Sequence, residues 1–224
     1  VPEQDMPYLN ELTVWHLLTM TTGHTENALF DPESGIQEDD GVRHFMQVPL
    51  SKKPGSYYYY DNCASYVLSS IVTKRTGLSV RDYLMPRFFT PLGIENPAWQ
   101  ICPKGRNLGF TGLYLKTSEI AKLGLVYLNG GVWKDQQLVP ADWVAESGKA
   151  LVDSTPHKDG PDNAMGYGYQ FWRCVPDAYR ADGYLGQFAI VLNALDAVIA
   201  VSSWEPKAQK ILDTLWATVL PKLR

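Results

Sequence analysis

A tyrosine and an asparagine two residues apart are the side chains that could most readily do chemistry together. Tyr60 and Asn62 end a segment that begins with Pro54 and Gly55, and an apolar helical pattern follows. Residues two apart in an extended chain point to the same side, and a helix N-terminus behind them adds positive potential. The phenol could then transfer a proton while the amide holds a substrate carbonyl or a lysine. The same spacing suits a plainer alternative, in which a strand ends here and Asn62 caps the helix.

A glycine near the C-terminal third is the second candidate. Gly183 follows Ala181 and Asp182 and is itself followed by Gly186, Gln187 and an apolar stretch. A glycine lets a substrate approach the strand backbone, whose N–H groups can stabilise a developing oxyanion. The alternative is a glycine turn that only precedes a hairpin strand. Aromatic side chains near both candidates could line a substrate cleft. The aromatic residues that we expect to do so are Tyr57, Tyr58, Trp172 and Tyr184.

Several other chemistries are disfavoured by the sequence. It has no G-x-S-x-G, no H-E-x-x-H, no C-x-x-C and no phosphate-binding glycine loop. The four histidines have no metal-ligand spacing, so we expect neither metal nor cofactor. A net charge of −4 with only short basic clusters argues against nucleic acid as a partner. No apolar run approaches the ~20 residues that span a bilayer, and three widely spaced cysteines favour a reducing compartment.

The periodicity predicts helices first and strands later. Helices are expected after Asn62 up to Gly77, over residues 79–84, over 117–129, and from Pro140. Strands are expected over 167–173, 185–192 and 197–204, with a hairpin loop at 193–196 and a final amphipathic helix after Pro206. This order predicts an α+β fold, with a mainly helical lobe over residues 1–164 and antiparallel strands with a covering helix over 165–224.

The order of several short motifs resembles the serine β-lactamase superfamily, which includes penicillin-binding proteins, D-alanyl-D-alanine peptidases and class C-like esterases. H-L-L-T-M-T-T-G at 16–23 is similar to the family's H-L-L-T-x-T-S-G, and the segment from Pro54 to Asn62 has the spacing of its second catalytic motif. F-T-P-L-G-I at 89–94 is similar to F-x-P-L-G-M, and residues 109–131 resemble a further family segment. The resemblance spans nearly the whole chain and implies acyl transfer through a serine in an S-x-x-K motif.

The S-x-x-K motif itself does not occur in these 224 residues. The resemblance would put it several dozen residues before the H-L-L-T segment, so we expect the nucleophile and its lysine on a segment outside this chain. Tyr60 would then share general-base work with that lysine, Asn62 would orient the substrate amide, and Gly186 or Gln187 would supply an oxyanion donor. We therefore expect these groups to face one common pocket.

The resemblance also bears on substrate and assembly. Ala181 stands where β-lactamases have lysine, which argues against carboxylate-bearing antibiotics as preferred substrates. The family fold would also lack its N-terminal strands, and the exposed sheet edge would pair with the missing segment or with a second copy of the chain. Two hypotheses remain: a serine hydrolase acting on an ester, amide or β-lactam and seen here as an inactive fragment, or a catalytically silent module that binds peptidoglycan-like peptides or a partner protein.

Overall fold

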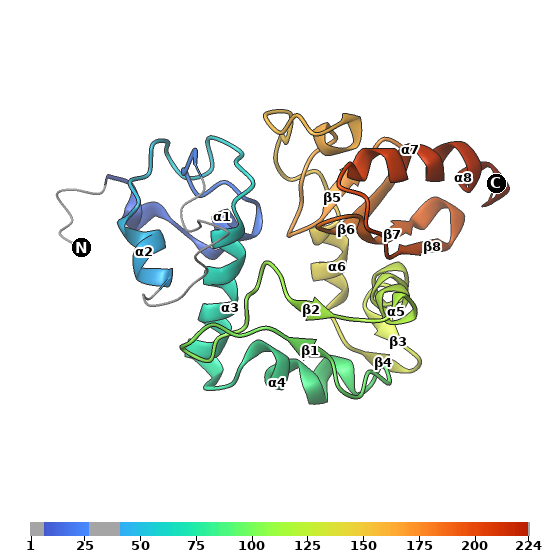
Figure 1. The fold of residues 1–224 in the computed structure, drawn as a ribbon, viewed down its shortest axis with the longest axis horizontal. Coiled ribbons are helices and arrows are strands. Elements are labelled where there is room, and N and C mark those ends of the chain that lie inside the picture. The colour runs from blue at the N-terminus through green and yellow to red at the C-terminus, as the bar shows by residue number, and fades with distance from the viewer. Residues whose placement is uncertain (1–6, 27–40, 224) are drawn as a thin grey trace. The chain divides into compact units, whose positions relative to one another are not determined.

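The computed structural model describes residues 7–26 and 41–223, which belong to two compact units, Val1–Tyr114 and Leu115–Arg224 (Figure 1). The division expected at 164/165 differs from this one. The helix over residues 117–128 packs against two strands of the C-terminal sheet, and it therefore groups with the second unit.

Short helices make up most of the first unit. Its elements are η2 (Leu9–Glu11), α1 (Val14–Leu18), α2 (Gly41–Gln47), α3 (Asn62–Thr76), α4 (Val80–Leu84), the π-helix η3 (Met85–Phe89), and the antiparallel strands β1 (Ala98–Trp99) and β2 (Leu113–Tyr114).

Helix α3 organises the first unit because α1, α2 and α4 all pack against it. Its buried face carries Tyr66 and Val67, and Leu17 and Phe45 are buried on α1 and α2. The predicted end of the helix is confirmed, since Gly77 adopts the left-handed conformation with φ 74°.

The second unit contains a four-stranded sheet and its covering helices. Its elements are α5 (Thr117–Leu128), β3 (Val132–Trp133), β4 (Gln136–Gln137), α6 (Ala141–Ser147), η4 (Pro161–Ala164), β5 (Trp172–Cys174), β6 (Ala178–Gly183), β7 (Gln187–Leu192), η5 (Asn193–Leu195), β8 (Ala197–Val201), α7 (Ala208–Thr218) and α8 (Leu220–Leu223).

The sheet is antiparallel with the order β5-β6-β7-β8. Alternate residues face opposite sides. One face, with Phe188 and Ile190, packs against Leu212 of α7, and the other, with Tyr179 and Val191, packs against Tyr127 of α5. Both faces are therefore covered, and the predicted amphipathic final helix is confirmed.

The sequence correctly predicted strands β7 and β8. It misplaced β5 and did not predict β6. The strand expected over 167–173 shortens to β5, because Gln170 has φ 63° and the Gly168 N–H donates to the Phe171 carbonyl in a turn. The fourth strand, β6, was not expected as an element of its own.

The polar residues of β6 explain why it was missed. Arg180 is only 1% exposed, although it lies in the middle of the strand. Its guanidinium donates to Asp182 Oδ2 at 2.8 Å, to the Arg173 carbonyl at 3.3 Å and to the Asn163 side chain. A charge can be buried when it is paired and hydrogen-bonded in this way, so a strand that looks polar in sequence lies inside the sheet.

Candidate functional site

The loop that carries Tyr60 is held by backbone hydrogen bonds to the H-L-L-T segment. Three N–H groups, of Lys52, Gly55 and Tyr59, donate to the carbonyls of Gly23, Thr21 and Met20 at 3.0, 2.8 and 2.9 Å. Residues 19–24 are all buried, so the loop packs on a fixed support. In the sequence, only the family resemblance marks this segment. Its structural role is to position the loop that precedes α3.

Gly23 is required for this close approach. Its φ is +96°, and a Cβ atom there would lie 2.3 Å from the carbonyl oxygen of Lys52. The clash would be with backbone, which cannot rotate away as a side chain can. The glycine of the motif is thus explained by the contact between the two segments.

Asp61 turns inward between the two candidate catalytic residues. It is fully buried, and its Oδ1 accepts the Cys63 N–H at 2.9 Å, so Asp61 and not Asn62 is the N-cap of α3. Its Oδ2 lies 3.9 Å from Nδ1 of the buried His24. His24 Nε2 is 3.3 Å from the Val48 carbonyl and must donate to it, which leaves Nδ1 to accept from the Thr22 hydroxyl at 3.1 Å. Burial lowers the pKa of His24, and the Asp61 carboxylate opposes this.

Tyr60 and Asn62 flank this inward carboxylate and are both half-buried. Asp61 has an extended conformation with φ −125° and ψ 111°. The phenol and the amide are therefore only partly buried, on either side of a fully buried carboxylate. They stand at the N-terminus of a 15-residue helix, whose dipole favours negative charge there. The positive potential at this helix end would stabilise a phenolate or the partial negative charge of a substrate carbonyl oxygen.

The neighbouring tyrosines differ in exposure. Tyr58 is 4% exposed and contributes to the core, so it offers a ligand little surface, whereas Tyr57 is half-buried. Burial, followed by the Asp61 charge, raises the pKa of Tyr59, which therefore stays protonated near neutral pH. The lining roles predicted for Tyr57 and Tyr58 stay predictions.

The second group of candidate residues lies in the β6–β7 hairpin of the second unit. Gly183 is the last residue of β6 and pairs with Gln187, the first of β7. The Gly186 N–H donates to the Gly183 carbonyl at 3.2 Å, so that N–H already serves the turn. The Gln187 side chain donates from Nε2 to the Ser203 carbonyl at 2.6 Å. Gly186 and Gln187 were the two residues predicted to donate a backbone N–H to an oxyanion. The Gly186 N–H already donates within the hairpin.

This turn is strained and held from one side by the segment after β8. Leu185 has φ 64°, a conformation that side chains with a Cβ rarely adopt. Its carbonyl accepts from the Ser203 hydroxyl at 3.0 Å and from the Glu205 N–H at 3.2 Å. Strain of this kind persists only where the surroundings fix it, and such turns are frequent at functional sites. Ser203 was not found from the sequence, since a lone serine near a strand end carries no signal.

The two aromatic residues predicted for this side of the cleft have opposite environments. Trp172 is 4% exposed and packs its ring 4.8 Å from Tyr167 and 5.0 Å from His157, so it offers a ligand little surface. Tyr184 is 84% exposed at the tip of the hairpin. Only Tyr184 is therefore available at the surface of its unit.

Within residues 7–26 and 41–223, no cluster of His, Cys, Asp and Glu has the arrangement of a metal site. None of the helices described there has the length and apolar character that a bilayer crossing requires.

Comparisons with known proteins place the chain in a family. The family model described as Beta-lactamase matches residues 1–216. The chain belongs to the Beta-lactamase family. The predicted fold class, α+β of the β-lactamase and transpeptidase type, is confirmed by solved structures as well. No curated protein sequence gives a significant match.

Three solved structures illustrate the Beta-lactamase fold of the chain. A Bacillus anthracis protein provisionally assigned as a 6-aminohexanoate-dimer hydrolase has a TM-score of 0.74 and 19% identity, over 96% of this chain and 64% of that one. SurE with D-Leu has a TM-score of 0.75 and 19% identity, over 98% and 56%. The octameric penicillin-binding protein homologue from Pyrococcus abyssi has a TM-score of 0.66 and 20% identity, over 94% and 56%. The chain thus spans less than two thirds of the length of each of these structures.

Proposed function

We propose that this chain supplies the tyrosine, asparagine and strand components of a serine hydrolase that forms an acyl-enzyme on an ester, amide or β-lactam. The observation that carries the proposal is the arrangement at the start of α3, where the half-buried Tyr60 and Asn62 flank the buried Asp61 at a helix N-terminus. Membership of the Beta-lactamase family supports the same reaction class. The substrate would be a small molecule or a peptide.

In this proposal Tyr60 takes part in proton transfer. A phenol has an ordinary pKa near ~10, so it acts near neutral pH only if a cation favours the phenolate. The lysine of an S-x-x-K motif would supply that cation, and the two groups would share one proton. Asn62 would donate to the carbonyl oxygen of the substrate or hold the lysine.

The strand residues would stabilise the oxyanion. Gly183 adds no side chain of its own at the end of β6, and the strained turn at Leu185 connects it to β7. Backbone N–H groups held in advance stabilise developing charge without further reorganisation. Since the Gly186 N–H is engaged in the turn, the proposal assigns the oxyanion donor to Gln187.

The nucleophile would come from residues outside these 224. No S-x-x-K occurs among them, and acyl transfer of this type requires the serine and the lysine together. The 224-residue chain alone would then be inactive.

The lack of an S-x-x-K motif among these 224 residues also suits a second candidate function, which is binding without catalysis. A chain without a nucleophile could bind a peptide or a partner protein at the residues that its relatives use for catalysis. The two candidates differ in one measurable property, which is covalent acylation.

The deciding experiment compares the complete natural protein with the 224-residue chain. Each is incubated with a p-nitrophenyl ester and with a chromogenic cephalosporin, while intact mass spectrometry follows acyl adducts. The hydrolase proposal expects turnover and a serine adduct in the complete protein, and neither in the 224-residue chain. Stoichiometric acylation of the 224-residue chain would contradict the missing nucleophile, and a complete protein inert to all substrates would favour the binding function.

A further inference from the structure

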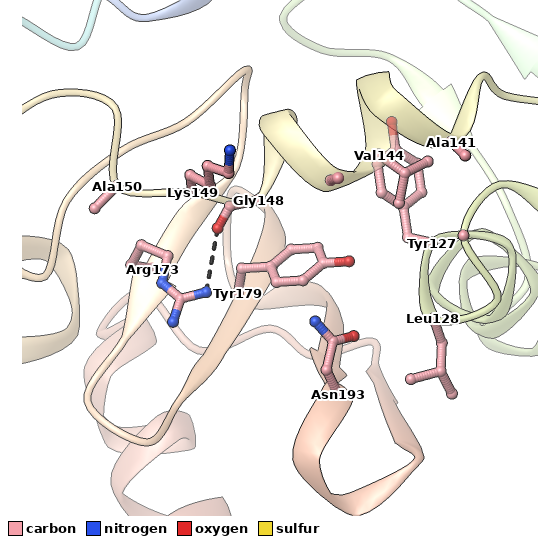
Figure 2. A pocket seen from close by; sticks show the side chains of 12 residues that line it. Tyr127, Leu128, Ala141, Val144, Gly148, Lys149, Ala150, Arg173, Tyr179 and Asn193 are labelled. Carbon is pink, nitrogen blue, oxygen red and sulfur yellow. Dashed lines mark hydrogen bonds between the residues drawn. The ribbon is translucent and has the colours of Figure 1, made fainter.

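A pocket lies in the second unit at the end of the sheet away from the β6–β7 hairpin. It has a volume of about 590 Å³ and is lined by residues of α5, α6, β5, β6 and the β7–β8 connection (Figure 2). Tyr179 in its wall is the second residue of β6, whereas Gly183 is the last. The two residues are four positions apart along the strand, which corresponds to roughly 13 Å. The pocket is therefore distinct from the hairpin residues of the proposed hydrolase site.

One side of the pocket is cationic. Arg173 and Lys149 line it, and none of the residues that line it is acidic. Lys149 Nζ pairs with Glu146 Oε2 at 2.6 Å, at side chains that are 60% and 41% exposed. Arg173 Nη1 donates to the Gly148 carbonyl at 3.1 Å, and its other terminal nitrogen pairs with Asp177 (Figure 2). A guanidinium has more N–H donors than these two bonds use. The Asp177 side chain is 85% exposed, and such exposed ion pairs contribute little, so a ligand carboxylate could compete with it.

A buried phenol supplies a neutral donor to the same space. Tyr179 is 4% exposed, and its ring extends into the pocket beside the Asn193 side chain (Figure 2). Burial raises the pKa of Tyr179 to about 12, so the hydroxyl stays protonated at neutral pH. No described residue makes a hydrogen bond to that hydroxyl. The hydroxyl is not one of the buried polar atoms that lack a partner among the described residues, so it is accessible from the pocket, where a ligand oxygen could accept its hydrogen bond.

The opposite side of the pocket is apolar. Leu128 of α5 and Ala141, Val144 and Ala145 of α6 line it. Figure 2 shows Val144 and Leu128 across the pocket from Lys149 and Arg173. Pockets of this size with a mainly apolar wall and a few convergent polar groups are typical of small-molecule sites.

We propose that this pocket binds a small monocarboxylic acid with an apolar body, its carboxylate between Arg173 and the Tyr179 hydroxyl and its body against Leu128 and Val144. Arg173 and Lys149 favour an anion, because the ion pairs that they make with Asp177 and Glu146 are open to solvent and weak. The apolar wall selects a hydrocarbon or aromatic body over a phosphate or a sugar. The proposal does not depend on the hydrolase function, since it uses none of the residues assigned to it.

The test measures binding of hexanoate and phenylacetate to the complete natural protein by NMR titration, with hexanamide and hexylamine as uncharged and cationic counterparts. The carboxylates should shift the amide signals of Gly130, Gly148 and Asn193. The amide should bind at least about tenfold more weakly, because hydrogen bonds to a charged group are the stronger ones. Equal binding of the acid, the amide and the amine would overturn the proposal.

Two variants and a control locate the site. Tyr179→Phe keeps the buried ring and removes only the hydroxyl, so it should weaken hexanoate binding about tenfold. Ala145→Phe adds bulk from an exposed position and should abolish binding. Tyr169→Phe, which changes a tyrosine outside the pocket lining, should leave binding unchanged. Wild-type affinity in Ala145→Phe, or no shift with either carboxylate up to its solubility limit, would refute the site.

Discussion

The two groups of candidate residues are positioned in different ways. Tyr60 and Asn62 belong to a loop held by hydrogen bonds between irregular segments, with Gly23 packed directly against the Lys52 carbonyl. Gly183 and Gln187 belong to paired strands, and their positions follow from the register of β6 and β7. In a sheet, many equivalent backbone hydrogen bonds together fix the position of each residue. In the loop, only a few contacts fix the positions of Tyr60 and Asn62. Substitutions in the loop should therefore have the larger and more local effects.

The largest effect is expected at Tyr60. Tyr60→Phe in the complete natural protein should lower kcat by roughly 10²–10⁴, the range for loss of a general base. Steady-state kinetics with the best ester substrate measures this. Tyr57→Phe, a half-buried tyrosine in the same loop, is the matched control and should keep most of the activity. An unchanged kcat in Tyr60→Phe would remove this residue from the mechanism.

The next effect tests the loop support. Gly23→Ala combines a strained φ of +96° with a Cβ only 2.3 Å from the Lys52 carbonyl oxygen, so it should cost at least about 2 kcal/mol of unfolding free energy. Gly77→Ala is the control, since its φ of +74° is also left-handed but no atom lies within 4 Å of the new Cβ. Urea unfolding of both variants separates steric conflict from backbone strain. Equal losses would mean that the contact with Lys52 has no steric cost.

The equivalent substitution in the hairpin should cost less. At Gly186, with φ +82°, a new Cβ would meet Ile211 Cδ1 at 2.2 Å, the end of a flexible side chain that can rotate away. Gly186→Ala should therefore lose about 1–2 kcal/mol, mostly from strain. The same urea experiment checks this. A loss greater than that of Gly23→Ala would reverse the proposed difference between loop and sheet.

The smallest expected effect is a pH dependence of the unfolding free energy, which arises from His24 in the segment that supports the loop. His24 has its pKa lowered by burial from the ordinary 6.5, so near that pH the unfolded chain binds a proton that the folded chain does not. Stability should therefore fall as the pH drops below about 6.5, by at most about 1.4 kcal/mol per pH unit, until the folded pKa is reached. His24→Gln should reduce this loss when unfolding is followed from pH 7.5 to 5.5, and the part that remains is expected from the less buried His16, whose pKa burial also lowers. The exposed His44→Gln is the control and should retain it.

Local sequence signals predicted the parts of the fold that local interactions decide. Gly77 ends α3 as expected, and Ser79 caps α4 by accepting the Asp82 N–H at 3.1 Å. The apolar side of the last helix is also correct, with Leu212 buried and Ile211, Leu215 and Trp216 packed beside it. These features depend on residues a few positions apart, so one sequence is enough to find them.

Features that depend on distant partners were not predicted. Strand β6 was missed because Arg180 and Asp182 look like surface residues until their mutual pairing in the fold is known. The hydrogen bonds that support the Tyr60 loop join backbone atoms of residues 29 to 39 positions apart. Such bonds leave no signal in the types of side chain. Asp61 was passed over as a cap because either Asp or Asn can cap a helix.

The hydrogen bonds that support the Tyr60 loop leave its side chains free to vary in sequence. All three come from backbone N–H groups and end on backbone carbonyls, so they impose no side-chain identity on residues 56–60 except through burial. Substitutions at the half-buried Tyr57 can alter what a ligand meets without releasing the loop from its place. A diverging lineage, or a protein engineer, could therefore exchange substrate preference at this loop while the placement of Tyr60 and Asn62 is preserved.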